Sequence, residues 1–399
     1  MTGRRAAALA LLALLVAGCD SSEPQRHERL PAGGPAGVVR IGLAHLLWPL
    51  DPTHASGRDE LTLARVLFAT PLRTDPETGA LRPGLCSSWS ASGRTWHLRC
   101  RHAGAIATQL RRARLFPARR IRAIDERRLV IALPAPRPEL PYLLTQVAAA
   151  PAGVPGPFRL ISASPERVVA ERPGLRLDVR RLEPHEALRL FRAGKLDEAP
   201  VPLGDLRASK LDPLLAPAVR VRPLLAADIV VFDRTVPPEV RRVYDATADR
   251  ADYQALVPEF EAPPAESLAD RSPPKASAAV IALREARKEI PSLPRLAVRF
   301  ARPADPDLTY GLDLLVAAWR DLGLGAVVGG PPAARFERLL APYPQAAALP
   351  AAVRGQLVVP IAWAVDARLV SPRLRGWKED ELGSVDYARV RFPGLSQRR

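Results

Sequence analysis

Residues 226–256 read AADIVVFDRTVPPEVRRVYDATADRADYQAL and divide the chain in two. The run at 229–232 is β-branched and aromatic, which predicts a buried strand. Pro237 and Pro238 end strand pairing and suit the first turn of a helix. A helix is therefore expected over residues 239–256, with one face formed by Val240, Val243, Tyr244, Thr247 and Ala248.

The same stretch resembles the crossover segment of the solute-binding protein family 5, the oligopeptide-, dipeptide- and nickel-binding proteins of bacterial ABC importers. In that family an apolar strand precedes a proline pair and a helix of the form Val-Arg-x-Ala-x-x-x-Ala-x-Asp-Arg. Asp233 stands where the family usually has Asn. The residues that match the helix are Val240, Arg241, Ala248, Asp249 and Arg250.

Residues 81–99 carry the most specific resemblance to this family. They contain LRPGL (81–85) and, after Cys86, SSWSASGRTWHLR (87–99). This is similar to the family's Leu-x-x-x-Pro-x-x-Gly-Leu-Ala-x-Ser-Trp run and the Thr-Trp-x-x-x-Leu-Arg strand that follows it. Trp89 and Trp96 bracket a turn at Gly93, so the stretch predicts a β-hairpin.

A hairpin centred on Gly93 places Cys86 opposite Cys100, since both are equally distant from that glycine. In an oxidising compartment this pair predicts a cross-strand disulfide. Two alternatives stay open: a pair of buried free thiols, or a metal site completed by His97 and His102. The irregular spacing of those four residues disfavours the metal site, and we expect neither a bound metal nor a cofactor.

The resemblance continues in order over most of residues 38–393, although two segments are shorter than in the family: the one after Cys100 and the one between 328 and 356. It implies an α/β, two-lobed, periplasmic-binding-protein-like (type II) fold with mixed sheets and a reduced second lobe. The first lobe is expected over residues 38–228, the second over 229–357, and a return to the first over 358–399. The strands at 229–232 and 358–363 should then lie side by side as paired crossings between the lobes.

The amino terminus has the pattern of an export signal. Arg4 and Arg5 precede a short apolar run that ends in small residues before Cys19, and the run is too short to span a bilayer as a helix. The ending resembles the lipobox of bacterial lipoproteins, which implies a signal peptide over residues 1–18 and lipidation of Cys19. A plain signal peptide is the alternative. Residues 19–37, polar and rich in Pro, Gly and Ser, predict a tether that anchors an exported protein to the cell membrane.

Composition limits the partners. The 399 residues are 47% hydrophobic and carry a formal net charge of +16, so the chain is globular and strongly basic. Its arginines are spread along the whole sequence and no nucleic-acid-binding motif accompanies them. We therefore expect no nucleic-acid partner, and instead attraction to an anionic envelope surface or an acidic ligand.

No catalytic motif supports an enzyme: the sequence lacks Gly-x-Ser-x-Gly, His-Glu-x-x-His, a P-loop and Cys-x-x-Cys. The resemblance implies a monomeric substrate-binding lipoprotein that captures a peptide-like or other small solute and delivers it to an ABC permease and ATPase complex. The alternative is a degenerate paralogue that serves as an envelope scaffold or partner-binding lipoprotein. Asp233 could receive an amine or cap a turn. The candidate solute-binding residues, each with a core or loop alternative, are Trp48, Phe232, Asp233 and Trp363.

Overall fold

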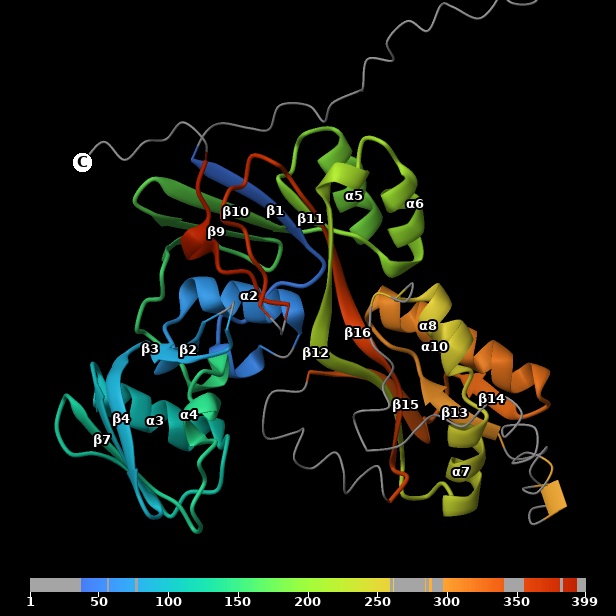
Figure 1. The fold of residues 1–399 in the computed structure, drawn as a ribbon, viewed down its shortest axis with the longest axis horizontal. Coiled ribbons are helices and arrows are strands. Elements are labelled where there is room, and N and C mark those ends of the chain that lie inside the picture. Colours follow the sequence, from blue (N-terminus) through green and yellow to red (C-terminus); the bar gives the residue numbers. More distant parts are fainter. Residues whose placement is uncertain are drawn as a thin grey trace, which may run out of the picture.

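The protein is seen here in a computed structural model, which describes residues 37–55, 57–75, 78–258, 261, 284, 287–288, 297–340, 355–380 and 383–392. The predicted signal peptide, Cys19 and nearly all of the predicted tether lie outside the described residues. A ten-stranded mixed sheet passes through both lobes (Figure 1). From edge to edge its strands are β14 (Gly325–Val328), β13 (Ala297–Ala301), β15 (Ala334–Leu340), β12 (Val219–Phe232), β16 (Val358–Val370), β11 (Glu198–Pro200), β1 (Val38–Leu43), β10 (Leu175–Arg181), β9 (Arg167–Arg172) and β8 (Arg159–Ala163).

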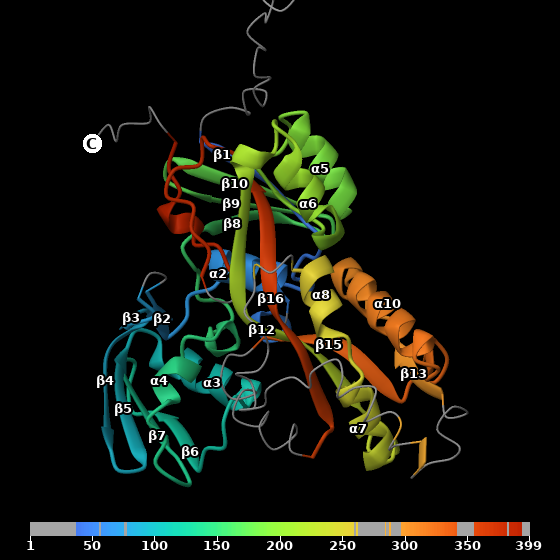
Figure 2. The same cartoon turned by 45° about the vertical axis from the view of Figure 1, so that its right-hand side comes forward.

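The two lobes are joined by β12 and β16, which run side by side from one lobe to the other (Figures 1 and 2). They pair antiparallel from Val231 opposite Val358 to Val219 opposite Leu369. The expected adjacency of the two crossings is therefore confirmed. The pairing register shifts between Pro223 and Ala227 and again after Asp228, and such irregularities bend and twist strands. The expected lobe boundary at 228/229 falls inside β12, at this bend.

The first lobe is built on β1 and β8–β11. Helix α2 (Arg58–Leu67) buries Leu63, Ala64 and Val66 in a core shared with β1 and β10. Helices α5 (Pro184–Arg192) and α6 (Leu206–Leu211) lie at the far end of the lobe from β13–β15 (Figure 2). The apolar residues of α5 and α6 belong to the same hydrophobic core as those of the second lobe. This core extends along β12 and β16.

A smaller body with its own hydrophobic core is attached to the first lobe (Figure 1, lower left). Its four-stranded sheet has the order β4 (Cys86–Ser92), β5 (Thr95–Cys100), β7 (Arg128–Ala132) and β6 (Arg120–Ala123). The sheet packs with α3 (Ala103–Ala113) and α4 (Leu140–Leu143), and the short hairpin β2 (Leu72–Thr74) and β3 (Leu81–Pro83) adjoins it.

The β4–β5 hairpin forms as predicted, with a corrected register. Ser92 pairs with Thr95, so the turn is the two-residue pair 93–94 and is not centred on Gly93. An irregularity between Cys86 and Ser88 adds one residue and restores Cys86 opposite Cys100. These two cysteines are joined by a disulfide.

The second lobe packs α7 (Pro238–Ala246), α8 (Arg250–Leu256) and α10 (Pro306–Asp321) against β13–β15. The prediction of one helix over 239–256 is wrong, because the helix stops after Ala246. The side chain of Asp249 accepts a hydrogen bond from the backbone N–H of Asp252 and begins a new helix there. Tyr244 lies in the core, as predicted for the apolar face of this stretch, and its ring meets that of Trp319 on α10 edge to face.

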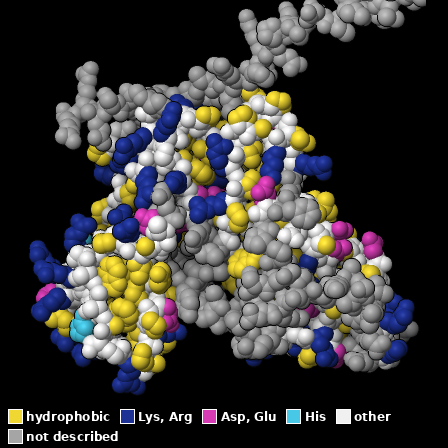
Figure 3. Space-filling view, viewed as in Figure 1, with side chains coloured by type: hydrophobic (Ala, Val, Ile, Leu, Met, Phe, Trp, Pro, Cys, Tyr) yellow, Lys and Arg dark blue, Asp and Glu magenta, His cyan; other side chains and the backbone are white. Residues whose placement is uncertain are grey.

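Figure 3 shows Lys and Arg side chains spread over all described parts of the visible face, with no single basic stripe. Among the described residues, no helix combines the length and apolar character that a membrane crossing requires.

A candidate solute site between the lobes

A pocket of about 280 Å³ lies where the two lobes meet. Its first-lobe wall contains Ala44 and Val201, which directly follow the parallel strands β1 and β11. Its second-lobe wall contains Asp305 and Asp307, which follow β13, and Arg338 of β15. The pocket thus lies at the carboxyl ends of strands from both lobes, the usual place for ligands in open α/β sheets.

Three helices begin at this pocket, since Arg58 of α2, Pro184 of α5 and Asp307 of α10 line it, and helix amino termini favour negative groups. Carboxylates of the protein lie at two of these termini. In α2, Glu60 accepts a hydrogen bond from the backbone N–H of the N-cap residue Gly57 (3.1 Å). In α10, Asp305 accepts one from the N–H of Asp307 (2.8 Å). Asp59 of α2 instead accepts from the backbone N–H groups of Ala44 (2.8 Å) and His45 (3.3 Å), in the loop after β1.

The negative charge of the buried Asp59 carboxylate is compensated by neighbouring groups of the protein. Burial acts to raise the pKa of this carboxyl, but Arg58, Arg368 and the two backbone N–H groups outweigh burial, and its pKa is lowered. Asp59 therefore stays ionised and structural near neutral pH.

Asp307 joins the two lobes. Its Oδ1 accepts a hydrogen bond from the backbone N–H of Leu203, in the first lobe, at 2.8 Å. Burial and the neighbouring Asp305 raise the pKa of Asp307 to about 6, although Leu203, Arg338 and Arg58 act to lower it. A carboxyl with this pKa can accept a hydrogen bond from a solute when ionised and donate one when protonated.

Arg338 is held rigidly in the second-lobe wall. Its Nε and Nη2 lie 2.7 and 3.0 Å from the two carboxylate oxygens of Asp228, on the neighbouring strand β12. The hydroxyl of Tyr253 donates a further hydrogen bond to Asp228 (2.7 Å), and burial followed by this carboxylate raises the pKa of the tyrosine. The charge of Arg338 is thus balanced inside the protein, and the side chain serves as a fixed wall of the pocket.

Arg58 connects the pocket to a crossing strand. It forms an ion pair with Asp366 of β16. Asp366 also accepts from Arg368 (2.8 Å), which in turn pairs with Glu198 of β11 (2.6 Å). Arg58 therefore links the pocket directly to a strand that joins the lobes.

The four residues predicted to touch solute are not among those that line this pocket. Trp48 is 49% exposed in the loop after β1, and Trp363 is half-buried on β16 opposite Ala227. Phe232 is 3% exposed and packs edge to face on Tyr244 in the second-lobe core.

Asp233 lies exposed in the turn after β12, where its carboxylate accepts a hydrogen bond from the N–H of Thr235 (2.8 Å). This is the turn-capping role that the sequence left open. That any of these four residues contacts a solute stays a prediction.

Asp59, Asp307 and Arg338 were not predicted as site residues from the sequence. The sequence Asp305-Pro306-Asp307 does carry a local signal, an N-cap residue followed by proline and an acidic first turn. That signal marks a helix start. The proximity of this helix start to Leu203 depends on the lobe arrangement, which one sequence does not report. Within the described ranges, no group of three or more His, Cys, Asp or Glu residues could hold a metal ion.

The architecture is that of the two-lobed, periplasmic-binding-protein-like α/β class, with mixed sheets. No protein-family model matches the sequence, and no curated protein sequence does. Solved structures do match. The murein tripeptide binding protein MppA of Escherichia coli has a TM-score of 0.76 at 14% identity, covering 90% of this chain and 99% of that one.

Two further solved structures cover 90% of this chain. The pheromone receptor PrgZ has a TM-score of 0.74 at 15% identity over 100% of its chain. OppA of Haemophilus influenzae, in complex with the peptide RPPGFSPFR, has a TM-score of 0.73 at 16% identity over 99% of its chain. The chain therefore shares the fold of these binding proteins, and at the level of fold the resemblance to solute-binding family 5 is confirmed.

A second MppA structure, an unliganded open form, superposes with a lower TM-score of 0.62.

Proposed function

We propose that this protein is the solute-binding component of an ABC importer, which holds a peptide-like or other small solute between its lobes and delivers it to a membrane permease. The observation that carries the proposal is the pocket built jointly by both lobes beside two paired crossing strands. The fold neighbours include the pheromone receptor PrgZ, whose mode of peptide binding is known, and OppA proteins in complex with peptides, which supports a peptide-like solute. A further neighbour is the substrate-binding domain of an oligopeptide ABC transporter from Bacillus anthracis.

The proposed mechanism is closure driven by differential affinity. A solute that contacts both walls binds the closed arrangement more tightly and shifts the population toward it. The register shifts in β12 supply the place where the crossing bends. On closure the N–H of Leu203 meets Asp307 and completes the pocket.

The proposal includes the lipid anchor at Cys19 and the tether that follows it. Their support is the sequence pattern alone, since Cys19 and nearly all of the tether lie outside the described residues. A tethered binding protein stays close to its permease, which raises the effective concentration of the loaded form at the membrane.

Thermal denaturation against a panel of di- to pentapeptides and nickel chelates tests solute capture. A solute present at 100 times its Kd should stabilise the protein by about 2.7 kcal/mol. The Asp307→Asn variant should weaken this effect, whereas Asp313→Asn, on an exposed position of the same helix, should not. Flat melting curves across the whole panel would reject solute capture. They would favour the scaffold alternative, to which the internal neutralisation of Arg58 and Arg338 lends some support.

A further inference from the structure

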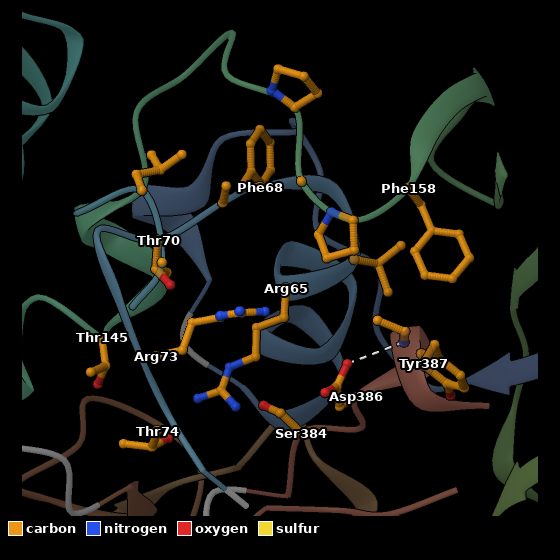
Figure 4. A pocket seen from close by; sticks show the side chains of 18 of the residues that line it. Arg65, Phe68, Thr70, Arg73, Thr74, Thr145, Phe158, Ser384, Asp386 and Tyr387 are labelled. Atoms are coloured by element: carbon orange, nitrogen blue, oxygen red, sulfur yellow. Dashed lines mark hydrogen bonds between the residues drawn. The ribbon is translucent and has the colours of Figure 1, made fainter. Parts of the chain in front are cut away.

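A second cavity, of about 450 Å³, lies wholly within the first lobe (Figure 4). It opens between α2, the β2–β3 hairpin and residues 378–380 and 384–388 of the returning segment, and it shares no lining residue with the pocket between the lobes. Much of its wall is apolar. Val66, Phe68, Leu85, Val154 and Phe158 contribute to that wall.

The charges around this cavity are predominantly positive. Arg65, Arg73, Arg101 and Lys378 line it, against the two carboxylates of Asp380 and Asp386. Figure 4 shows the side chains of Arg65 and Arg73 both reaching into the cavity. The apolar wall and the excess positive charge together favour an anion that carries an apolar body.

The carboxylates of Asp380 and Asp386 do not neutralise all of the positive charge around the cavity. Asp380 pairs with Arg65, and Asp386 accepts a hydrogen bond from the N–H of Ala388 (3.1 Å). Arg73 donates to the carbonyl of Pro83 (3.2 Å), and no described carboxylate lies within ion-pair distance of it. The Arg65 side chain is 26% exposed, and burial lowers its pKa to about 10, so a further anion beside it would stabilise its charged form.

A buried hydroxyl also faces this cavity. Ser384 is 1% exposed and lines the cavity, and its Oγ has no hydrogen-bond partner among the described residues. In Figure 4 it lies on the same side of the cavity as Arg65 and Asp386. Buried polar groups are usually paired, so this hydroxyl is a donor available to a ligand.

We propose that this cavity is a second binding site, for a small monocarboxylate with an apolar body. The carboxylate lies against Arg65, Arg73 and Ser384, and the apolar body packs on the partly exposed Phe68. A phosphate dianion fits less well, since Asp380 and Asp386 border the same arginines and repel a second negative charge. The site is independent of solute capture between the lobes.

Isothermal titration of the full chain with octanoate and 3-phenylpropanoate tests the site, with octanamide and inorganic phosphate as controls. Both carboxylates should bind, octanamide and phosphate at least tenfold more weakly, because a charge-assisted hydrogen bond exceeds a neutral one. Arg73→Gln and Ser384→Ala should each weaken octanoate binding, by about tenfold and about fivefold respectively. The matched control is Arg82→Gln, because Arg82 pairs with Arg73 across the hairpin but does not line the cavity.

Failure of both carboxylates to bind would overturn the proposal, as would equal binding of octanamide or unchanged affinity in Arg73→Gln and Ser384→Ala. The Asp307→Asn variant distinguishes octanoate binding in this cavity from binding in the pocket between the lobes. Octanoate affinity should be unchanged in that variant, and a loss there would place the probe between the lobes and reject the second site. Peptide binding in the absence of octanoate binding would reject this inference alone.

Discussion

Nη1 of Arg368 lies 2.6 Å from Oε1 of Glu198, and neither side chain has more than 2% of its surface exposed. The pair connects the crossing strand β16 to β11 at the centre of the first lobe. The other carboxylate oxygen of Glu198 accepts hydrogen bonds from Trp377 (2.7 Å) and Tyr387 (2.8 Å) of the returning segment. One buried carboxylate thus secures a crossing strand, a central strand and the chain's return.

Glu198→Gln should lower the free energy of unfolding by about 1.5–3 kcal/mol, because it weakens the charge-assisted hydrogen bonds that Glu198 accepts, while Asp366 remains paired with Arg368. Urea denaturation followed by circular dichroism measures this. Glu166→Gln is the control, since its partner Arg181 is 51% exposed and the carboxylate itself 62% exposed. An exposed pair should contribute less than about 1 kcal/mol, and equal losses in the two variants would contradict a structural role for the buried pair.

Asp307 should make stability fall as pH rises. The pKa of Asp307 is raised from 3.8 to about 6 in the folded state. The stabilising contribution of its protonated carboxyl to the free energy of unfolding is therefore complete below pH 3.8 and is lost as pH rises through about 6. The full loss is at most about 3 kcal/mol. In Asp307→Asn, the amide oxygen can still accept a hydrogen bond from Leu203, but the side chain cannot ionise. The free energy of unfolding of this variant relative to wild type should therefore rise between pH 5 and pH 8.

Urea denaturation at pH 5 and pH 8 checks this difference, with Asp313→Asn as the exposed control on α10. His45 also lines the pocket, but it is present in every variant and cancels in the comparison. A wild-type and Asp307→Asn difference that stays constant with pH would refute the raised pKa.

The crossings and the β4–β5 hairpin were predictable because their signals are local. An apolar run before Pro237 and Pro238 specifies a strand end, and Trp89 and Trp96 around a glycine specify a hairpin. The helix break before Asp249 was missed because the apolar periodicity continues through it. The pocket was missed for a different reason. Asp307 and Leu203 meet only through the arrangement of two lobes, which local patterns do not encode.

Reducing the disulfide between Cys86 and Cys100 should destabilise the smaller body. The cysteines are 14 residues apart, and closing a loop of that size contributes about 3 kcal/mol in the chain-entropy model. Melting curves with and without dithiothreitol should therefore differ, in wild type and in Cys19→Ala alike. Peptide mass spectrometry should find the two cysteines cross-linked, and alkylation of both under non-reducing conditions would contradict the pairing.

Lipidation of Cys19 predicts where the protein is found. Cys19→Ala should release the exported chain from the membrane fraction, because the acyl chains that anchor it are lost. Metabolic labelling with an alkyne fatty acid should mark wild type and the control Ser22→Ala but leave Cys19→Ala unlabelled. A protein that stays in the membrane fraction without Cys19 would contradict the anchor.

Gly156 is required where the smaller body joins the first lobe. A Cβ at this position would lie 2.6 Å from the backbone N of Phe68 and 2.7 Å from the carbonyl carbon of Leu67, while the N–H of Gly156 donates to the carbonyl of Leu67 (2.8 Å). Gly156→Ala must therefore push two backbones apart, at a cost of about 1–3 kcal/mol. Gly104→Ala is the opposite control, since a Cβ there meets nothing within 4 Å, and alanine in a helix gains about 1 kcal/mol over glycine. Urea denaturation should thus show a lower free energy of unfolding for Gly156→Ala and a higher one for Gly104→Ala. Because Gly156 also lines the second cavity, Gly156→Ala should also weaken octanoate binding, whereas Gly104→Ala should not.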